Sequence, residues 1–419
     1  MKKSIKLSIL SLLSAGLLLT NCNKFESQED IEPLGKEQEK GKAEPQGTIH
    51  ENENGRIELF PNAKPVTVAD AKMLTSITED KLVYSGKNDF FNSIKAGDIL
   101  ISPNTDIAPD GYLRLVNSVE KTDDGYIFYA TNTTLDKAIK NGELHLAAPI
   151  MFPSQVEDVA SGVEAGNEAK ANGSQAEAAG TFTLTKTFSY PLNHILYDYD
   201  GNYSGTTYDQ IKTNGNFTLT ASMVLDLNFS GGTLTYLRVR APLSAGNNQT
   251  LTLGGTLNLP SKTAQLANVT TIPSAGFFVG VVYVSIKPYF NLYIDYSGSI
   301  SAYAKFGYNG STTITPEIKY QNNTWTTAAP KTFSLTGTKP VTNVSATFRA
   351  SLRPRLTFAL YGCTSCASAY LEGSVYGSIT CSLTPVSKQI KGGLAASAGA
   401  VLFGFNKSYN NFLNYPINL

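Results

Sequence analysis

Two stretches in the second half of the chain carry side chains whose types and spacing could bind a ligand. The first reads "YDYDGNYSGTTYD" and covers residues 197–209. It alternates three oxygen ligands: Asp198, Asp200 and Asn202. Hard cations such as calcium prefer oxygen ligands, but calcium loops place glycine where this chain has Tyr203. A hairpin turn at Asp200-Gly201 explains the same residues, so we predict no metal site here.

Tyrosine is frequent in the same stretch, and exposed tyrosines could form a flat surface that stacks against a sugar or a partner protein. The candidates are Tyr197, Tyr199, Tyr203 and Tyr208. Alternate tyrosines on a strand also pack against their neighbours within a sheet. Ligand contact and sheet packing are both open interpretations.

The second stretch is "FRASLRPRL", residues 348–356, in which Arg349, Arg353 and Arg355 are two or four residues apart. Even spacing places all three on one face of a strand. Arginine binds carboxylate and phosphate through parallel N–H donors, so this row could contact an anionic glycan or lipopolysaccharide. A solvated strand face is the alternative.

Catalytic and cofactor motifs are missing from the sequence. There is no phosphate-binding P-loop, no H-E-x-x-H zinc motif and no G-x-S-x-G nucleophile elbow. The histidines, His50, His145 and His194, leave few options for a general base. We therefore predict no catalytic residue, no cofactor and no enzymatic activity. A carbohydrate-active hydrolase on a β scaffold is the alternative, because that chemistry needs only two carboxyl groups.

Three cysteines lie late in the chain, and an oxidising compartment would favour pairing two of them. Cys363 and Cys366 have the spacing of a redox motif, but their flanks alternate like strands instead of forming a βαβ unit. We expect a structural disulfide or buried thiols among Cys363, Cys366 and Cys381. The alternation around Cys381 places that residue in the core.

The first residues have the features of an exported protein. Lys2, Lys3 and Lys6 accompany a mostly apolar run over residues 7–19, which is too short to span a membrane as a helix. The pattern indicates a secretory signal.

The apolar run ends at Leu19-Thr20-Asn21-Cys22, which resembles the lipobox of bacterial lipoproteins. The resemblance implies that residues 1–21 are a signal peptide and that Cys22 is acylated. Asn21 departs from the common pattern, which has Gly, Ala or Ser before the cysteine. Such a chain would be anchored by lipid to the bacterial outer membrane, facing the periplasm or the cell surface.

Composition divides the rest of the chain. Residues 22–54 hold many Glu and Lys and few aromatics, so we predict a lipidated, disordered tether. Residues 153–180 are rich in Ala, Glu, Gly and Ser and are predicted to be a linker. Residues 181–419 contain 16 Lys and Arg against 7 Asp and Glu, although the whole chain has zero net charge. We expect anionic ligands for this half and no nucleic-acid partner.

The two remaining segments are predicted to be β-rich. Over 55–152 we predict a small module, with a hairpin whose turn is at 123–125 and one short helix after Thr133 or Thr134. Its "GDILIS", "APDGYLRLVNSVE" and "TLDKAI" segments resemble a module of uncharacterised secreted β-rich bacterial surface proteins. That resemblance implies a structural or binding role.

Alternating apolar and polar residues continue through 181–419, as in 217–229, with a turn expected at Ser297-Gly298. We predict a mainly β fold in which the small module precedes a larger antiparallel β-sandwich. A transmembrane β-barrel is the alternative, because long alternating strands with many tyrosines also suit that fold.

These features together predict a membrane-anchored envelope lipoprotein with a non-enzymatic binding or adhesion role. Its partners would be the membrane, through the N-terminal lipid, and a glycan or protein ligand.

Overall fold

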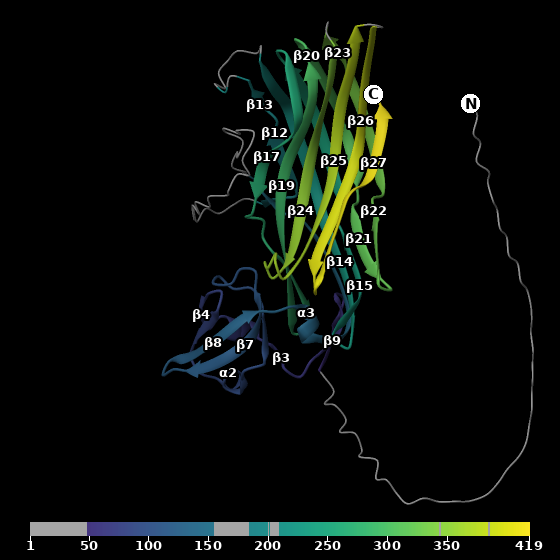
Figure 1. Cartoon of the computed structure of the whole chain (residues 1–419). Helices are drawn as coiled ribbons and strands as arrows, with labels where there is room; N and C mark the ends of the chain where they lie inside the picture. The colour runs from purple at the N-terminus through teal and green to yellow at the C-terminus, as the bar shows by residue number, and fades with distance from the viewer. Residues whose placement is uncertain (1–47, 155–183, 200, 202–208, 343–344, 384–385) are drawn as a thin grey trace, which may run out of the picture. The chain divides into compact units, whose positions relative to one another are not determined.

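Strands dominate the described part of the chain, and the predicted mainly β fold is confirmed (Figure 1). The computed structural model describes residues 48–154, 184–199, 201, 209–342, 345–383 and 386–419. Within these residues the strands form sheets of 12, 7, 6 and 2 strands, and nearly all pairing is antiparallel. We call the three large ones the first, second and third sheet. The signal peptide, most of the predicted tether and most of the linker lie outside the described residues.

The first sheet is organised around β14 (Gln210–Ser230), which is long enough to pair with different strands along its two halves. Its first half lies between β12 or β13 and β16, and its second half lies between β9 and β15. The other strands of this sheet are β1 (Ile49–Asn52), β2 (Gly55–Leu59), β9 (Ile139–Pro149), β12 (Thr187–Pro191), β13 (His194–Asp198), β15 (Thr233–Arg240), β16 (Leu243–Leu253), β20 (Ala304–Ile314), β21 (Glu317–Gln321), β22 (Thr324–Ala328) and β23 (Lys331–Thr342).

Segments of the predicted small module also belong to the first sheet. β9 pairs with β14, from Gly142 opposite Phe229 to Pro149 opposite Ser222, and β2 pairs with β9. β1 extends the same edge, although its residues fall within the predicted tether. The predicted module and the predicted larger domain therefore share one sheet.

The rest of the predicted module forms the third sheet. Its strands are β3 (Ala63–Pro65), β4 (Leu74–Ile77), β5 (Lys81–Ser85), β6 (Ile99–Ser102), β7 (Tyr112–Lys121) and β8 (Gly125–Asn132). β7 and β8 form the predicted hairpin. The predicted helix is a single turn, α3 (Leu135–Ala138), and two further short helices, α1 (Val68–Ala71) and α2 (Asp89–Ser93), were not predicted. A small ladder pairs β10 (Phe152–Pro153) with β11 (Leu184–Thr185).

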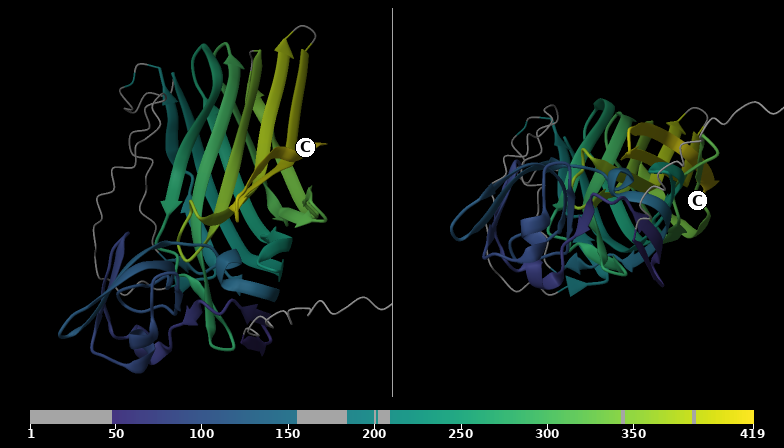
Figure 2. Two further views of the ribbon diagram at one scale, coloured as in Figure 1. Left: turned by 60° about the horizontal axis from the view of Figure 1, so that its bottom comes forward. Right: turned by 90° about the horizontal axis from the view of Figure 1, so that it is seen from below.

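The second sheet contains the longest hairpins (Figure 2). Its strands are β17 (Leu257–Val269), β18 (Ala275–Val279), β19 (Val282–Ile300), β24 (Ala346–Leu360), β25 (Ala367–Leu383), β26 (Val386–Leu402) and β27 (Phe405–Asn418). The expected turn at Ser297-Gly298 is wrong, because β19 continues to Ile300. A Cβ on Gly298 would lie 2.1 Å from the carbonyl oxygen of Thr347, so glycine here allows two strands to approach closely.

The first and second sheets bury their inner faces against each other. The rings of Phe306 on β20 and Phe348 on β24 lie 6.3 Å apart across the core. The alternation predicted over 217–229 is confirmed, since its odd-numbered residues are all buried. A second hydrophobic cluster, which includes Phe91 and Phe128, forms a separate core against the third sheet.

All described residues belong to the compact unit Pro45–Leu419. None of the helices in the described ranges has the length and apolar character that crossing a bilayer requires.

Candidate functional site

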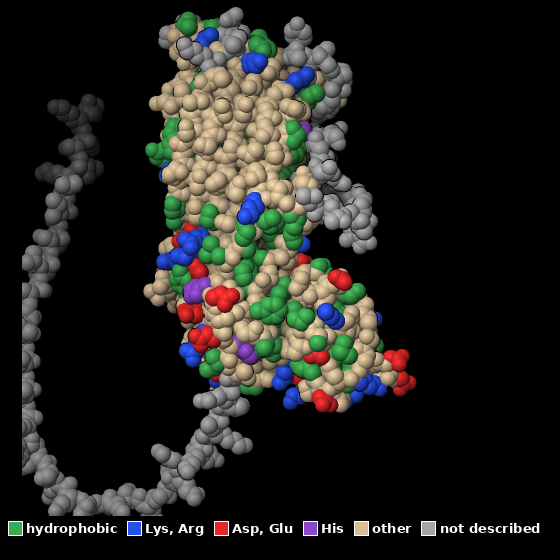
Figure 3. All heavy atoms as spheres, turned by 180° about the vertical axis from the view of Figure 1, so that it is seen from behind, with side chains coloured by type: hydrophobic (Ala, Val, Ile, Leu, Met, Phe, Trp, Pro, Cys, Tyr) green, Lys and Arg blue, Asp and Glu red, His purple; other side chains and the backbone are tan. Residues whose placement is uncertain are grey.

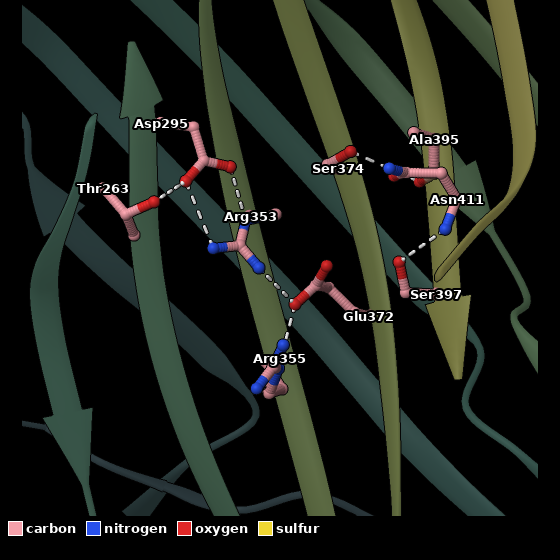
Figure 4. A network of polar contacts seen from close by, with 9 residues as sticks. All are labelled: Thr263, Asp295, Arg353, Arg355, Glu372, Ser374, Ala395, Ser397 and Asn411. Atoms are coloured by element: carbon pink, nitrogen blue, oxygen red, sulfur yellow. Dashed lines mark hydrogen bonds and ion pairs between the residues drawn. The ribbon is translucent and has the colours of Figure 1, made fainter. Parts of the chain in front are cut away.

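The outer face of the second sheet carries the three arginines singled out in the sequence. On β24 the alternate residues Phe348, Leu352 and Leu356 are buried in the core. The odd-numbered positions therefore point away from the core, and these include Arg349 and Arg353. Side chains from β17, β19, β25 and β27 lie beside the arginines on this outer face (Figure 4).

Arg353 is at the centre of a network of ion pairs (Figure 4). Its Nε and Nη2 donate to the two carboxylate oxygens of Asp295 at 2.6 and 3.2 Å, and its Nη1 donates to Glu372 Oε2 at 2.8 Å. Arg355 Nε donates to the same Glu372 oxygen at 2.9 Å. Thr263 on β17 donates its hydroxyl to Asp295 at 2.6 Å. The network thus links β17, β19, β24 and β25 on their outer face.

The charged side chains of this network are partly buried and paired with one another. The side chain of Glu372 is only 4% exposed, and two guanidinium groups compensate its charge. Burial disfavours the charged form of Arg353, but hydrogen bonds and charges from Asp295 and Glu372 outweigh burial and raise the pKa of Arg353. Arg355 also lies 4.7 Å over the ring of Tyr370. These side chains are held in place and compensate one another.

Arg349 has a different environment. Its guanidinium carbon lies 3.8 Å from the centroid of the Tyr376 ring, and no carboxylate in the described ranges pairs with it. The Tyr376 ring lies against β26, where a Cβ on Gly393 would be 2.3 Å from the ring's Cζ. Burial raises the pKa of Tyr376 more than the charge of Arg349 lowers it. Arg349 is therefore an exposed cation positioned by a ring and not by an ion pair.

A groove of about 470 Å³ is lined by both Arg349 and Arg353. Sites for small molecules typically have volumes of about 300–1,000 Å³. Ser351 and Ser374, which are 7% and 6% exposed, contribute small hydroxyl side chains to the lining. Asn411 lines the groove from β27, where its backbone N–H donates to Ser397 Oγ at 3.0 Å. The groove therefore offers hydrogen-bond donors and acceptors together with a cation.

Few titratable side chains line the groove. Its lining includes one carboxylate, Asp295, which belongs to the arginine network, and it contains neither histidine nor cysteine that could act as a base or nucleophile. Within the described ranges, no group of three or more His, Cys, Asp and Glu side chains could hold a metal ion.

The residues predicted around 197–209 lie elsewhere. Tyr197 is half-buried against the hydrophobic core, whereas Tyr199 is 72% exposed. Asp198 is buried and accepts a hydrogen bond from Gln210 Nε2. These residues lie on or just after β13 of the first sheet, and none of them lines the groove. The other four candidates, Asp200, Asn202, Tyr203 and Tyr208, lie outside the described residues.

The late cysteines are not part of the groove lining. Cys363 and Cys366 form a disulfide in the connection between β24 and β25. Cys381 is a buried free thiol on β25, and burial raises its pKa against the opposing effect of Lys388. Cys22, the predicted lipidation site, lies outside the described residues.

Several important residues of the site were not predicted: Asp295, Ser351, Glu372, Ser374 and Tyr376. The residues meet because of strand pairing, which sets Glu372 opposite Arg355 and Asp295 opposite Ser351. The scarcity of acids could have identified Asp295 and Glu372, because residues 181–419 contain only 7 Asp and Glu. An isolated acid on an outward strand position indicates a specific partner.

The outer face of the first sheet provides a comparison. Its charged side chains gather in one half, while the other half carries mostly uncharged side chains (Figure 3). In the charged half, His145 Nδ1 and Arg238 Nε lie 3.2 and 2.8 Å from the Asp226 carboxylate. On β20 of the same sheet, Ser311 is an exposed hydroxyl residue of the same type as those in the groove.

Searches of protein-family models, curated proteins and solved structures each gave no match to this chain.

Proposed function

We propose that this chain is a membrane-anchored lipoprotein of the bacterial envelope with a binding or adhesion role, and that the groove on the second sheet holds a glycan. The observation that carries the proposal is the groove lining, in which Ser351, Ser374 and Thr263 supply hydroxyls beside two guanidinium groups. Sugar hydroxyls both donate and accept hydrogen bonds, so they can match this mixed lining. The lipid anchor rests on the resemblance of residues 19–22 to a lipobox.

A rigid lining favours binding, because side chains that are already ordered lose little entropy when a ligand arrives. Arg353 is held by Asp295 and Glu372, and Thr263 is held by Asp295. The groove also lies on long paired strands and not on loops. These features support recognition of a ligand of defined shape.

The experiment is a glycan array probed with residues 45–419, the compact unit that contains both hydrophobic clusters. Replacing Ser374 with tryptophan should fill the groove and abolish binding to the glycans that the parent chain retains. The matched control is Ser311→Trp, which places the same side chain on the outer face of the first sheet. Circular dichroism and the melting temperature of each variant check that the fold is intact.

Two outcomes would contradict the proposal. One is a parent chain that binds nothing on the array or in pull-downs from host and envelope extracts. The other is binding that Ser374→Trp and Ser311→Trp leave equally unchanged. Release of shortened sugars from a bound glycan would instead favour the hydrolase alternative, whose two carboxyl groups must flank the scissile bond.

A further inference from the structure

We infer that the ligand of this groove is an acidic glycan whose carboxylate groups are received by Arg349 and Lys391. The inference rests on the proposed function and specifies its ligand class. It starts from the distribution of charge, because the network of Arg353 and Arg355 is compensated by Asp295 and Glu372. Of the three arginines on this face, Arg349 is the one that pairs with neither Asp295 nor Glu372.

A second cation lies in the same cross-strand row. Arg349 on β24 pairs in register with Ser378 on β25, and Ser378 pairs with Lys391 on β26. Lys391 is exposed while its neighbour Ile390 is buried, so the lysine points to the outer face with Arg349. Adjacent strands are about 4.8 Å apart, which separates the two positions by about 10 Å across the sheet. No carboxylate in the described part of the chain pairs with Lys391 either.

This geometry favours a carboxylate over a neutral sugar at Arg349. Neutral sugar groups would leave the guanidinium charge uncompensated, whereas a carboxylate can accept two parallel N–H bonds from it. The ring of Tyr376 positions the guanidinium before the ligand arrives, which reduces the ordering cost of binding.

A glycan explains the rest of the lining better than an acidic peptide does. Ser351 and Ser374 are small and nearly buried hydroxyl residues, and Ser261 and Ser297 line the same groove. Such a surface offers hydrogen bonds to a ligand rich in hydroxyls and little apolar area for peptide side chains. An extended acidic polysaccharide can place sugar hydroxyls in the groove and carboxylates along the Arg349–Lys391 row.

The test measures the affinity of residues 45–419 for oligogalacturonate, for its methyl ester and for poly-glutamate. The acid and the ester share one sugar backbone and differ in charge, whereas poly-glutamate carries charge without sugar. We expect binding to the acid and at least tenfold weaker binding to both other probes. Raising the salt concentration from 50 to 200 mM should weaken binding of the acid, because exposed charges are screened.

Variants assign the effect to residues. Arg349→Gln should weaken binding of the acid by about 10- to 100-fold, the loss expected for a charged hydrogen bond. Lys391→Gln should have a smaller effect. Arg349→Lys should bind more tightly than Arg349→Gln, because it keeps the positive charge but lacks the parallel N–H donors of arginine. Lys305→Gln is the matched control, since it removes an exposed cation from the outer face of the first sheet.

The possible failures are distinguishable. If the acid and the ester bind equally, or if Arg349→Gln binds like Lys305→Gln, the acidic ligand is wrong while the groove remains a glycan site that Ser374→Trp blocks. If poly-glutamate binds as tightly as the acid, selectivity for a sugar is wrong. If neither these probes nor any glycan on the array binds the parent chain, the proposed function itself fails.

Discussion

Glu372 links β25 to β24 on the outer face of the second sheet. It accepts hydrogen bonds from both Arg353 and Arg355, and its side chain is almost inaccessible to water. A buried carboxylate is stable only when a positive charge compensates it, and the partly buried guanidinium groups beside it likewise need its negative charge. Asp295 has a different position, with a side chain that is 29% exposed.

We predict that Glu372→Ala lowers the free energy of unfolding by about 3 kcal/mol, since removing one partner leaves partly buried charge uncompensated. Asp295→Ala should cost less, about 1 kcal/mol, because water can replace part of an ion pair that is only partly buried. Urea denaturation of residues 45–419 measures both values. Equal losses for the two variants would show that burial of Glu372 does not matter.

The cysteines give a second prediction for single residues. Without reductant, iodoacetamide at pH 8 should leave folded residues 45–419 almost unmodified, because Cys381 is buried and its raised pKa reduces the thiolate fraction. Unfolding should expose one reactive thiol, and reduction should add Cys363 and Cys366. Mass spectrometry counts the modified residues. Rapid modification of Cys381 in the folded chain would contradict its burial.

Small residues on β26 allow large rings on β25 to lie flat across the sheet. A Cβ on Gly393 would be 2.3 Å from Cζ of Tyr376, and a Cβ on Gly399 would be 2.3 Å from Cε1 of Tyr370. The two strands pair over their full lengths, so each tyrosine lies directly opposite its glycine. The glycines of "GGLAASAGA" thus position the rings that contact Arg349 and Arg355.

We therefore predict that Gly393→Ala costs about 1–3 kcal/mol of stability, the usual cost of overpacking, by displacing the Tyr376 ring. It should also weaken ligand binding, because Arg349 would lose its stacking partner. In a Tyr376→Ala background the same Gly393→Ala change should cost almost nothing, since the clash is gone. A double-mutant cycle by urea denaturation measures this coupling. Additive effects of the two changes would contradict it.

At the scale of the whole molecule, β9 connects the predicted small module to the larger domain, because it pairs with the second half of β14. Leu144 and Leu146 on β9 belong to the same hydrophobic cluster as the inner faces of the first and second sheets. Residues 181–419 alone would lack this strand and expose half of one edge of β14.

We predict that a fragment of residues 181–419 is unstable or aggregates, whereas residues 45–419 unfold cooperatively. Size-exclusion chromatography and thermal unfolding followed by circular dichroism compare the two. A fragment that is monomeric and melts at the same temperature would mean that β9 adds nothing to the stability of the larger domain.

At the level of the whole chain, the lipid anchor is also a prediction. Mass spectrometry of the mature protein should find an acylated Cys22 at its N-terminus, and Cys22→Ser should move the protein from the detergent phase to the aqueous phase. An unmodified mature terminus would contradict membrane anchoring without affecting the groove.

The fold class and the inward faces of the strands can be read from the alternation of apolar and polar residues. Period-two alternation decides which side chains face a core, so the burial of Phe217 and Cys381 could be predicted, as could the hairpin of β7 and β8. The turn expected at Ser297-Gly298 failed because glycine serves close strand approach as well as turns, and local pattern does not distinguish these two uses.

Which outward-facing residues meet depends on how the strands pair in the folded sheets. Arg353 and Arg355 resembled free cations in the sequence, but strand pairing brings Asp295, distant in the chain, and Glu372 against them and leaves Arg349 with a ring instead. Pairing of β9 with β14 was equally hidden, because strand order depends on contacts between segments that no local periodicity encodes. The physical reason is the same in both cases: alternation is a property of one strand, whereas a site on a sheet is a property of its neighbours.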